Sequence, residues 1–426
     1  MLIATAATFV VLLGLSMPIV FALGLAAVVG LAVGGYPLQM VASTVIGASQ
    51  SWILLAIPSF VFAGALMERC GMSHALVELA RALVGWLRGG LGMTVIVVSY
   101  FFSDICGSKM AEVTAISSAL MPALKRAGYR AEDAASLVAA GSAMGMLVPP
   151  AIFMIVLASI TNVSAVALFL AGFIPAAVIG VVLCALVFVQ AHILGWPKDT
   201  LPSWVGLRRA AREAAVPLVI PLVILGGFYV GAFTATEAGA VVALYALLAA
   251  RLYYRNLSWR EIADIACESA VLTAAVVFLT AVATVFQYLL GVAGVPALMA
   301  GMLAPLHASP FLFLVSVTVL TMIFGMVLEG LPAAVVLVPV LFPIATKMGV
   351  NPVHFDIVQT AAVGIGIFLP PLGVGLLMAL RFARVPVFGH FRYYWPYLIG
   401  LFVGLLLIIS VPELSLMLPR RAGYIR

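Results

Sequence analysis

Four ionisable residues stand in stretches of the chain that are otherwise apolar or weakly polar. Asp104, Lys109 and Glu112 lie in the segment SDICGSKMAEVTAISSALMP, and Glu329 is the only charged residue between positions 269 and 346. Charged side chains are costly inside a lipid bilayer, and those that occur there usually serve a function. Lys109 could bind the carboxylate of a substrate, Asp104 could be a cation ligand, and Glu329 could act near the ion or substrate site.

Each of these assignments has a structural alternative. Lys109 could form a local ion pair with Glu112, which follows three residues further along a helix. Asp104 could cap a helix, and Glu329 could make a structural hydrogen bond. The residue types alone leave both interpretations open at each position.

Catalytic and metal-binding motifs are missing from the sequence. The five histidines form no HExxH spacing, the four cysteines form no CxxC pair, and neither a GxxxxGK[ST] loop nor a nucleophile elbow occurs. A membrane-embedded enzyme, such as a protease or a lipid transferase, would need paired catalytic groups at one depth. We therefore expect a protein that is not an enzyme and that carries no cofactor.

Membrane helices must position the candidate residues. Hydrophobic residues make up 65% of the 426 residues and charged residues 8%, against about 25% charged residues in a typical soluble domain. Uncharged runs such as positions 1–67 and 134–190 can hold several spans of roughly 20 residues each. The apolar run 398–411 shows none of the alternation of a barrel strand. The expected fold class is an all-α integral membrane protein with many spans.

Basic residues cluster between the apolar runs, where they would set the orientation in the membrane. The net charge of +6 comes from clusters such as Arg208, Arg209 and Arg212, and it therefore does not indicate a nucleic-acid partner. Arg420 and Arg421 near the C-terminus indicate that this end is cytoplasmic. We expect a chain that crosses its membrane many times.

An internal repeat with a period of 221 residues runs through the chain. Similarity between the two copies is weak outside glycine and proline, so the repeat is structural rather than a recent duplication. We expect two halves, residues 1–210 and 211–426, within one membrane domain. The glycines and prolines match without a gap in the pairs Pro122 and Pro343, Gly128 and Gly349, Gly145 and Gly366, Pro149 and Pro370, Pro150 and Pro371, and Pro175 and Pro396.

Each copy contains a helix that a Pro-Pro pair breaks in mid-membrane. Proline removes a backbone donor and blocks the preceding turn, and such irregular backbone is tolerated only inside protein or beside a water-filled cavity. Helices broken at matching places in two repeats are typical of transporter binding sites, where half-helix N-termini attract anions and free carbonyls coordinate Na⁺. The sequence thus predicts a substrate and Na⁺ site, with Na⁺ as the only metal, held through backbone carbonyls and hydroxyls near these positions. The candidate residues are Ser103, Asp104, Gly107, Ser108, Lys109, Gly145, Val148, Pro149, Pro150, Gly325, Glu329, Gly330, Gly366, Pro370, Pro371 and Gly373.

Several long blocks, in the right order, resemble the large permease subunit of the TRAP (tripartite ATP-independent periplasmic) transporters. They are LLAIPSFVFAGALMERCGMS near the start, GMLVPPAIFMIVLASITNVSAVALFLAGFIP in mid-chain, and FGMVLEGLPAAVVLVPVLFPIATKMGVNPVHFDIV and FLPPLGVGLLMAL in the second half. The likeness covers essentially the whole chain. The first hairpin of this resemblance, around residues 106–112, departs from the family pattern. This chain reads CGSKMAE there, where the family usually reads SGSSAAT. Lys109 and Glu112 here replace small or hydroxyl residues.

The resemblance implies a scaffold and a transport domain built from two inverted repeats with re-entrant hairpins, which move as an elevator in the manner of the ion transporter superfamily. It implies Na⁺-driven uptake across the bacterial inner membrane of a small carboxylate, such as a C4-dicarboxylate, a sialic acid, a sugar acid or a keto acid. The implied partners are a small four-helix membrane subunit and a periplasmic substrate-binding protein that delivers the substrate. A stand-alone sodium and organic-anion symporter, which needs no binding protein, is the alternative.

Overall fold

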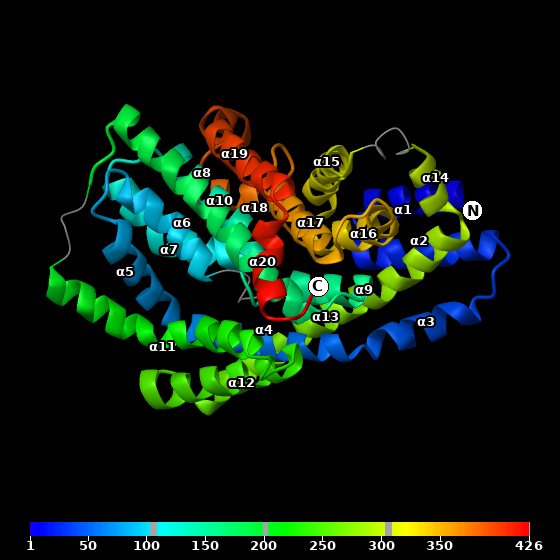
Figure 1. The fold of residues 1–426 in the computed structure, drawn as a ribbon, viewed down its shortest axis with the longest axis horizontal. Coiled ribbons are helices and arrows are strands. Elements are labelled where there is room, and N and C mark those ends of the chain that lie inside the picture. Colours follow the sequence, from blue (N-terminus) through cyan, green and yellow to red (C-terminus); the bar gives the residue numbers. More distant parts are fainter. Residues whose placement is uncertain (103–108, 199–202, 303–308, 426) are drawn as a thin grey trace.

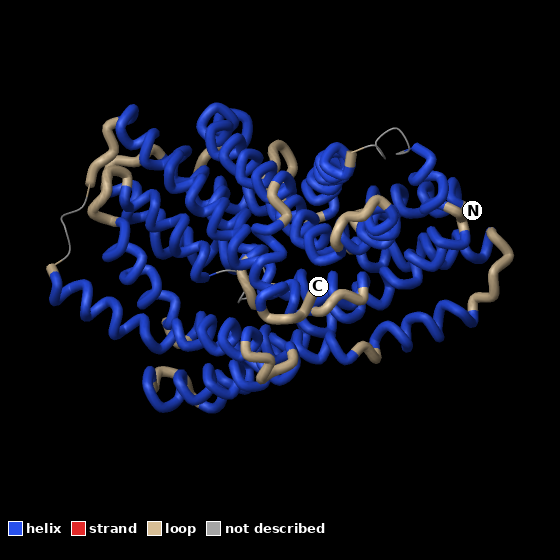
Figure 2. The backbone as a smooth tube through the Cα atoms, in the orientation of Figure 1, coloured by secondary structure: helices blue, strands red, loops and turns tan. Residues whose placement is uncertain are grey.

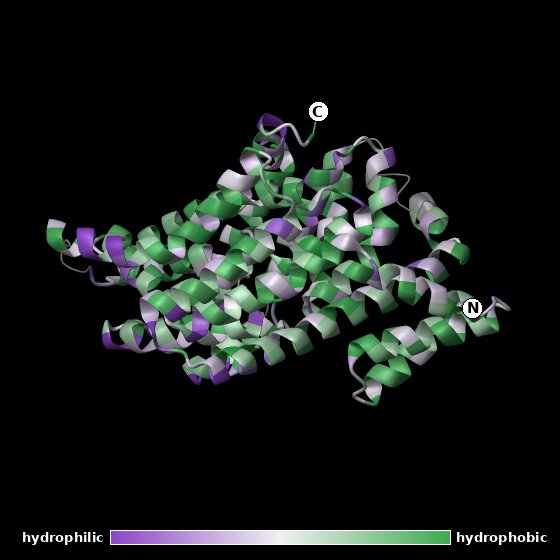
Figure 3. Cartoon of the chain, turned by 90° about the horizontal axis from the view of Figure 1, so that it is seen from below, coloured by the Kyte–Doolittle hydropathy of each residue, from purple (hydrophilic) through white to green (hydrophobic). Residues whose placement is uncertain are grey.

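The computed structural model describes residues 1–102, 109–198, 203–302 and 309–425, and every regular element in these ranges is a helix (Figure 1, Figure 2). Eight of the described helices are long and apolar enough to cross a membrane, and a bent helix pair would add a ninth span. Hydrophilic residues are sparse and gather in a few patches, whereas hydrophobic residues cover most of the body (Figure 3). The predicted multi-span helical fold is confirmed.

One group of helices packs pairwise, α12 on α4, α11 on α5, and α13 on both α2 and α3. In Figure 1, α3, α4, α11, α12 and α13 run along the lower side of the view, and α1, α2 and α14 lie at its right. Its N-terminal members are α1 (Leu2–Gly14), α2 (Ile19–Val33), α3 (Gln39–Ser49), the short η1 (Trp52–Leu55), α4 (Ala56–Arg69) and α5 (Met72–Val84). Its members from mid-chain are α11 (Trp204–Tyr229), α12 (Ala235–Leu248) with the π-helical turn η4 (Ala249–Tyr254), α13 (Trp259–Val292) and α14 (Val295–Met302).

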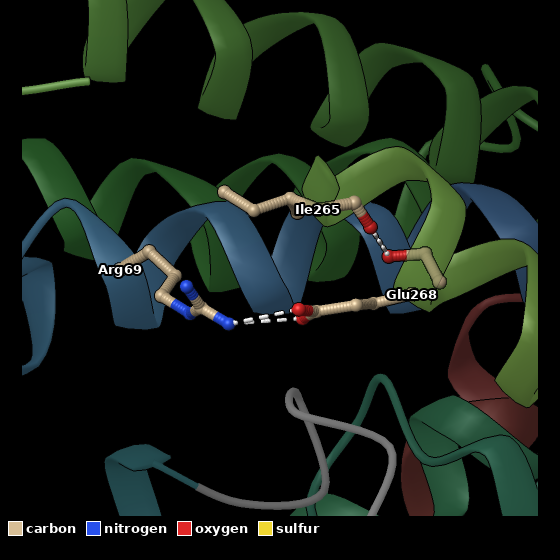
Figure 4. Close-up of polar contacts among 4 residues, drawn as sticks. Arg69, Ile265 and Glu268 are labelled. Atoms are coloured by element: carbon tan, nitrogen blue, oxygen red, sulfur yellow. Dashed lines mark hydrogen bonds and ion pairs between the residues drawn. The ribbon is translucent and has the colours of Figure 1, made fainter. Parts of the chain in front are cut away.

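Helix α13 begins where the sequence signals a helix start. The Glu261 carboxylate accepts a hydrogen bond from the backbone N–H of Ser258 at 2.7 Å, and the Ser258 hydroxyl accepts one from the Glu261 N–H at 3.3 Å. This reciprocal pair is a capping box. Further along α13, Glu268 forms an ion pair at 2.9 Å with Arg69 at the end of α4 (Figure 4). Both side chains of this pair are more than half exposed.

The other group of helices contains the repeat. Helices α7 (Lys109–Arg126), α8 (Ala131–Met144), α9 (Ile152–Thr161) and α10 (Ala165–Leu194) recur as α16 (Gly330–Lys347), α17 (Pro352–Gly366), α18 (Val374–Ala383) and α19 (Val387–Ser410). Helices α7 and α16 have 18 residues each, and α9 and α18 have 10 each. Gly128 and Gly349 both adopt positive φ, 86° and 79°, in the turns after α7 and α16. Helix α6 (Gly90–Phe102) precedes the first copy, α15 (Pro310–Leu328) precedes the second, and α20 (Glu413–Arg421) ends the chain.

The two copies exchange their short helices. Helix α9 of the first copy packs on α16 of the second, and α18 of the second packs on α7 and α8 of the first. Helices α8 and α17 lie at the centre of this arrangement, and every residue from Asp133 to Met144 and from Val353 to Gly366 is buried. The ends of both central helices are therefore surrounded by protein, which is the setting that irregular backbone needs at membrane depth.

Candidate functional site

The first central helix is broken at the predicted Pro-Pro pair. After α8 the chain makes one 3₁₀ turn, η3 (Gly145–Leu147), passes through Val148 in an extended conformation, and reaches a cis Pro149–Pro150 bond before α9 begins. The two helical segments are bent by 41°. All residues from 145 to 150 are buried. The freed backbone groups of the first break thus face protein interior.

The second central helix is broken at the matching place, with a cis Pro370–Pro371 bond after α17. Here the chain folds back on itself, because the N–H of Gly375 donates to the carbonyl of Ile367 at 3.1 Å. A Cβ on Gly373 would lie 2.6 Å from that same carbonyl oxygen, so the fold-back requires glycine. Pro370 is half-buried and Pro371 is exposed, so the second break reaches the surface of the chain whereas the first does not.

The two breaks meet at a close contact between α8 and α17. A Cβ on Gly364 would lie 2.5 Å from the carbonyl oxygen of Ala143 and 3.6 Å from Cβ of Met146. A Cβ on Gly330, at the start of α16, would lie 3.6 Å from Cε of Met146 and 2.8 Å from Cδ1 of Ile367. The structure therefore brings the turn that contains Met146, in the first break, against two parts of the second copy: the broken helix α17, and the hairpin formed by α15 and α16.

Gly325 and Gly366, both candidates from the sequence, place two helix backbones in contact. A Cβ on Gly366 would lie 2.7 Å from the carbonyl oxygen of Met322 and 3.2 Å from Cα of Gly325. Helix α15 thus approaches the end of α17 with no side chain between the two. The carbonyls of this last turn lie where two backbones and the second break converge.

Lys109 and Glu112 form the buried ion pair that was one of the two interpretations of these residues. The Lys109 ammonium lies 2.5 Å from Glu112 Oε2, and the two side chains are 8% and 1% exposed. A Cβ on Gly145 would lie 2.9 Å from Glu112 Oε1 and 3.0 Å from Lys109 Nζ. Gly145 therefore lets the ion pair pack directly against the first break, and this places a lysine ammonium beside freed backbone.

Glu329 occupies the single residue between α15 and α16. Its side chain is exposed, its backbone adopts φ 67°, and its carboxylate forms no hydrogen bond or ion pair with another described residue. A structural hydrogen bond of the Glu329 side chain is therefore not seen with any described residue, and its role near the ion or substrate site stays a prediction. Four further candidates, Ser103, Asp104, Gly107 and Ser108, lie outside the described residues.

The breaks offer both kinds of backbone group. A helix leaves its last carbonyls and its first N–H groups without partners in the helix itself. The residues that precede α9 and α18, Ala151 and Gly373, provide no side-chain cap for these N–H groups. Some of these groups are already bonded, because the carbonyls of Ile365 and Gly366 accept from Phe368 and Leu369, and the Gly375 N–H donates to Ile367. A carbonyl oxygen keeps a second lone pair for a cation, and the remaining N–H groups, with the positive end of the helix dipole, can face an anion at the starts of α9 and α18.

Three residues that carry this geometry were not among the sequence candidates. They are Met146 and Gly364, which join the two breaks, and Gly172 of α10, where a Cβ would lie 2.0 Å from the carbonyl oxygen of Leu147. Gly364 stands two residues before a candidate, in the string AVGIG. A close approach of two backbones is a general reason for such a small-residue string, but the string does not tell which partner approaches.

Comparison with known proteins assigns the chain to a family. Residues 6–414 match the family model described as the tripartite ATP-independent periplasmic transporter, DctM component. The chain is 33% identical over 378 residues to the C4-dicarboxylate TRAP transporter large permease protein DctM of Pseudomonas aeruginosa, with 88% of each chain covered. It is 32% identical to the 2,3-diketo-L-gulonate TRAP transporter large permease protein YiaN of Escherichia coli, with 90% of each covered.

A solved structure shares the fold. The YdaH transporter of Alcanivorax borkumensis matches with a TM-score of 0.58 at 14% sequence identity, over 88% of each chain. The family, and not this likeness of fold, makes the protein a transporter rather than an enzyme. The chain belongs to the DctM component family, the large permease subunits of the tripartite ATP-independent periplasmic transporters.

Proposed function

We propose that this chain is the part of a Na⁺-coupled symporter that moves a small organic acid across the bacterial inner membrane. In this proposal Na⁺ is held by backbone carbonyls at the breaks, and the carboxylate of the substrate is held nearby by helix N-termini. Symport follows if the two ions stabilise one another in the same site, because each then binds better when the other is present.

The observation that carries the proposal is the contact between the two breaks. Gly364 lies against the Ala143 carbonyl, and Met146 lies between the broken end of α8 and the hairpin at Gly330. One site would therefore contain carbonyl groups and helix N-termini from both repeats. Broken helices in matching positions of two repeats are where secondary transporters bind substrate and coupling ion.

The proposal of an organic acid rests on the chemistry of the site and on the relatives. The printed names of the two relatives specify a C4-dicarboxylate and a diketo sugar acid, both of which are anions. In this chain the Lys109 ammonium lies beside Gly145, and it would add a positive charge to the anion subsite. Because Glu112 compensates that charge at 2.5 Å, an arriving carboxylate would have to compete with Glu112 for the ammonium.

We further propose that the repeat moves relative to the remaining helices, in an elevator motion. The packing supports this, because α8 packs on α17 and α18, and α9 on α17, whereas α11 packs on α5, α12 on α4, and α13 on α2 and α3. The two groups touch each other through α5 with α6 and through α13 with α16. The proposed partners are a small four-helix membrane subunit and a periplasmic binding protein that delivers the substrate. The C-terminal arginines would then face the cytoplasm.

Reconstitution tests the proposal. Vesicles that contain this chain and its small subunit should take up a C4-dicarboxylate, sialic acid or sugar keto acid only when the matching binding protein is added and a Na⁺ gradient is imposed. Replacing external Na⁺ with choline should abolish uptake. Undiminished uptake in choline would contradict Na⁺ coupling, and uptake without any binding protein would favour the stand-alone symporter.

A further inference from the structure

A carboxyl group lies in the interior of the protein, away from the two breaks. Asp356 stands in the first half of α17, its side chain is fully buried, and its Oδ2 lies 2.8 Å from the hydroxyl of Thr161 at the end of α9. Asp356 and Thr161 are 195 residues apart and belong to different copies of the repeat. This contact is therefore a polar link between the two copies.

The hydrogen bonds around Thr161 indicate where the proton lies. The Thr161 hydroxyl oxygen is 2.8 Å from Asp356 Oδ2 and also 2.8 Å from the carbonyl oxygen of Leu157. A hydroxyl has one proton, a carbonyl only accepts, and an ionised carboxylate only accepts. If Asp356 were ionised, two acceptors would compete for that one proton. If Asp356 is protonated, its Oδ2–H donates to Thr161 and Thr161 donates to Leu157, so every contact has a donor.

The remaining surroundings of the carboxyl group do not compensate a negative charge. Asp356 Oδ1 has no hydrogen-bond partner among the described residues. Gln359, one turn along α17, accepts from the hydroxyl of Thr321 at 2.6 Å, and its amide nitrogen donates to no described residue. A buried carboxylate with so few donors would be strongly disfavoured, whereas a neutral carboxyl group tolerates this environment better.

Charged groups elsewhere do not change this conclusion. Helices α9 and α15, which supply Thr161 and Thr321, carry no titratable side chain, and His354 on α17 itself is bonded through Nδ1 to Ser415 at 2.7 Å. The titratable side chains on the other helices that pack against α17 are Glu132 and Asp133 on α8, Cys184 and His192 on α10, Lys347 on α16, His390, Arg392, Tyr393, Tyr394 and Tyr397 on α19, and Glu413, Arg420 and Arg421 on α20. Among the described residues, no hydrogen bond or ion pair joins any of these side chains to Asp356.

We propose that Asp356 is a proton-binding site in the interior of the protein, and that its bound proton makes the contact with Thr161 a neutral link between the two copies of the repeat. The proposal does not depend on which substrate is carried or on Na⁺ coupling. A protonated Asp356 carries no negative charge, so the link between α17 and α9 persists without a counter-ion.

Infrared spectroscopy of the purified protein tests the proposal directly. At neutral pH, the wild type minus Asp356→Asn difference spectrum should contain the C=O stretch of a protonated carboxyl group. The matched control is Asp264→Asn on α13, which removes an exposed carboxylate and should give carboxylate bands. Carboxylate bands in the Asp356 difference spectrum would overturn the proposal.

A second variant covers the case in which Asp356→Asn does not fold. Thr161→Val keeps the carboxyl group but removes the acceptor of its proton, so the protonated C=O band should remain and shift to higher frequency. The proposal would be equally overturned if the spectra of wild type and Thr161→Val differed by no shift of a protonated C=O band.

The pH dependence of unfolding gives an independent readout. In the unfolded chain at neutral pH an aspartate is ionised, so a folded state that keeps the proton binds one proton more than the unfolded state. Folded wild type should then lose stability as pH rises, and its unfolding constant relative to Asp356→Asn should increase by about tenfold per pH unit. A ratio that stays constant from weakly acidic to weakly alkaline pH would mean that no proton is bound there.

Discussion

Replacing Lys109 with alanine tests whether the buried ion pair supports the fold, the transport site or both. The pair lies at 2.5 Å with side chains 8% and 1% exposed, so removing the ammonium leaves the Glu112 carboxylate buried and without that counter-charge. Breaking a buried ion pair in this way typically costs about 3–5 kcal/mol of unfolding free energy. We expect a loss of this size for Lys109→Ala.

The matched control is Lys125→Ala, the same substitution on the same helix. Lys125 is exposed, and its ammonium donates to the carbonyl of Ala383 at 3.1 Å. Removing this hydrogen bond leaves no buried charge behind, and it should cost on the order of 1 kcal/mol. The two variants should therefore differ by several kcal/mol when unfolding is followed by SDS titration in mixed micelles, and Lys109→Ala should also transport less than Lys125→Ala.

A double variant separates folding from substrate binding. Lys109→Met combined with Glu112→Leu replaces the ion pair with apolar side chains of similar size, and such replacements of buried pairs are often neutral or stabilising. If Lys109 also binds substrate, this variant should fold well yet fail in the uptake assay. Normal uptake by a stable double variant would refute the substrate role, and equal stability of the two single lysine variants would refute the argument from burial.

Two further predictions follow from the packing. Gly364→Ala should destabilise the protein by about 1–3 kcal/mol, because its Cβ would lie 2.5 Å from the backbone carbonyl oxygen of Ala143. The control is Gly226→Ala on α11, where a Cβ would have nothing within 4 Å and the substitution should be neutral or slightly stabilising. Equal melting temperatures for the two variants would contradict the close contact at Gly364. Arg69→Ala should cost less than about 1 kcal/mol in the same SDS titration, because its ion pair with Glu268 is more than half exposed, and a larger loss would mean that the pair is protected from solvent in the membrane.

The spacing of glycine and proline predicted well where the helices are interrupted. The 221-residue offset placed both helix breaks at the pairs where the structure has them. These signals are encoded within a few residues of where they act, since proline and glycine restrict or release the backbone at their own positions. The sequence could also identify Glu112 as the local partner of Lys109, because a helix fixes which residue lies one turn away.

Partners that are far apart in the sequence were beyond such reasoning. Nothing near Asp356 indicates that it meets Thr161, and nothing near Gly364 names the Ala143 carbonyl as its neighbour. The unequal burial of Pro150 and Pro371 also breaks the symmetry that the repeat predicts. A hydrophobic pattern reports which faces are buried but not against what, so tertiary contacts of this kind require coordinates.

The exchange of short helices between the copies has a consequence for how the protein assembles. Because α9 packs on α16, and α18 packs on α7 and α8, neither copy can complete its own interior when it is the only one present. A chain cut between the copies would yield two fragments that each expose an unfinished interior until they find one another. The interior of the first copy is therefore completed only after the second copy has been synthesised and packs against it. The two copies fold as one unit rather than as two independent domains.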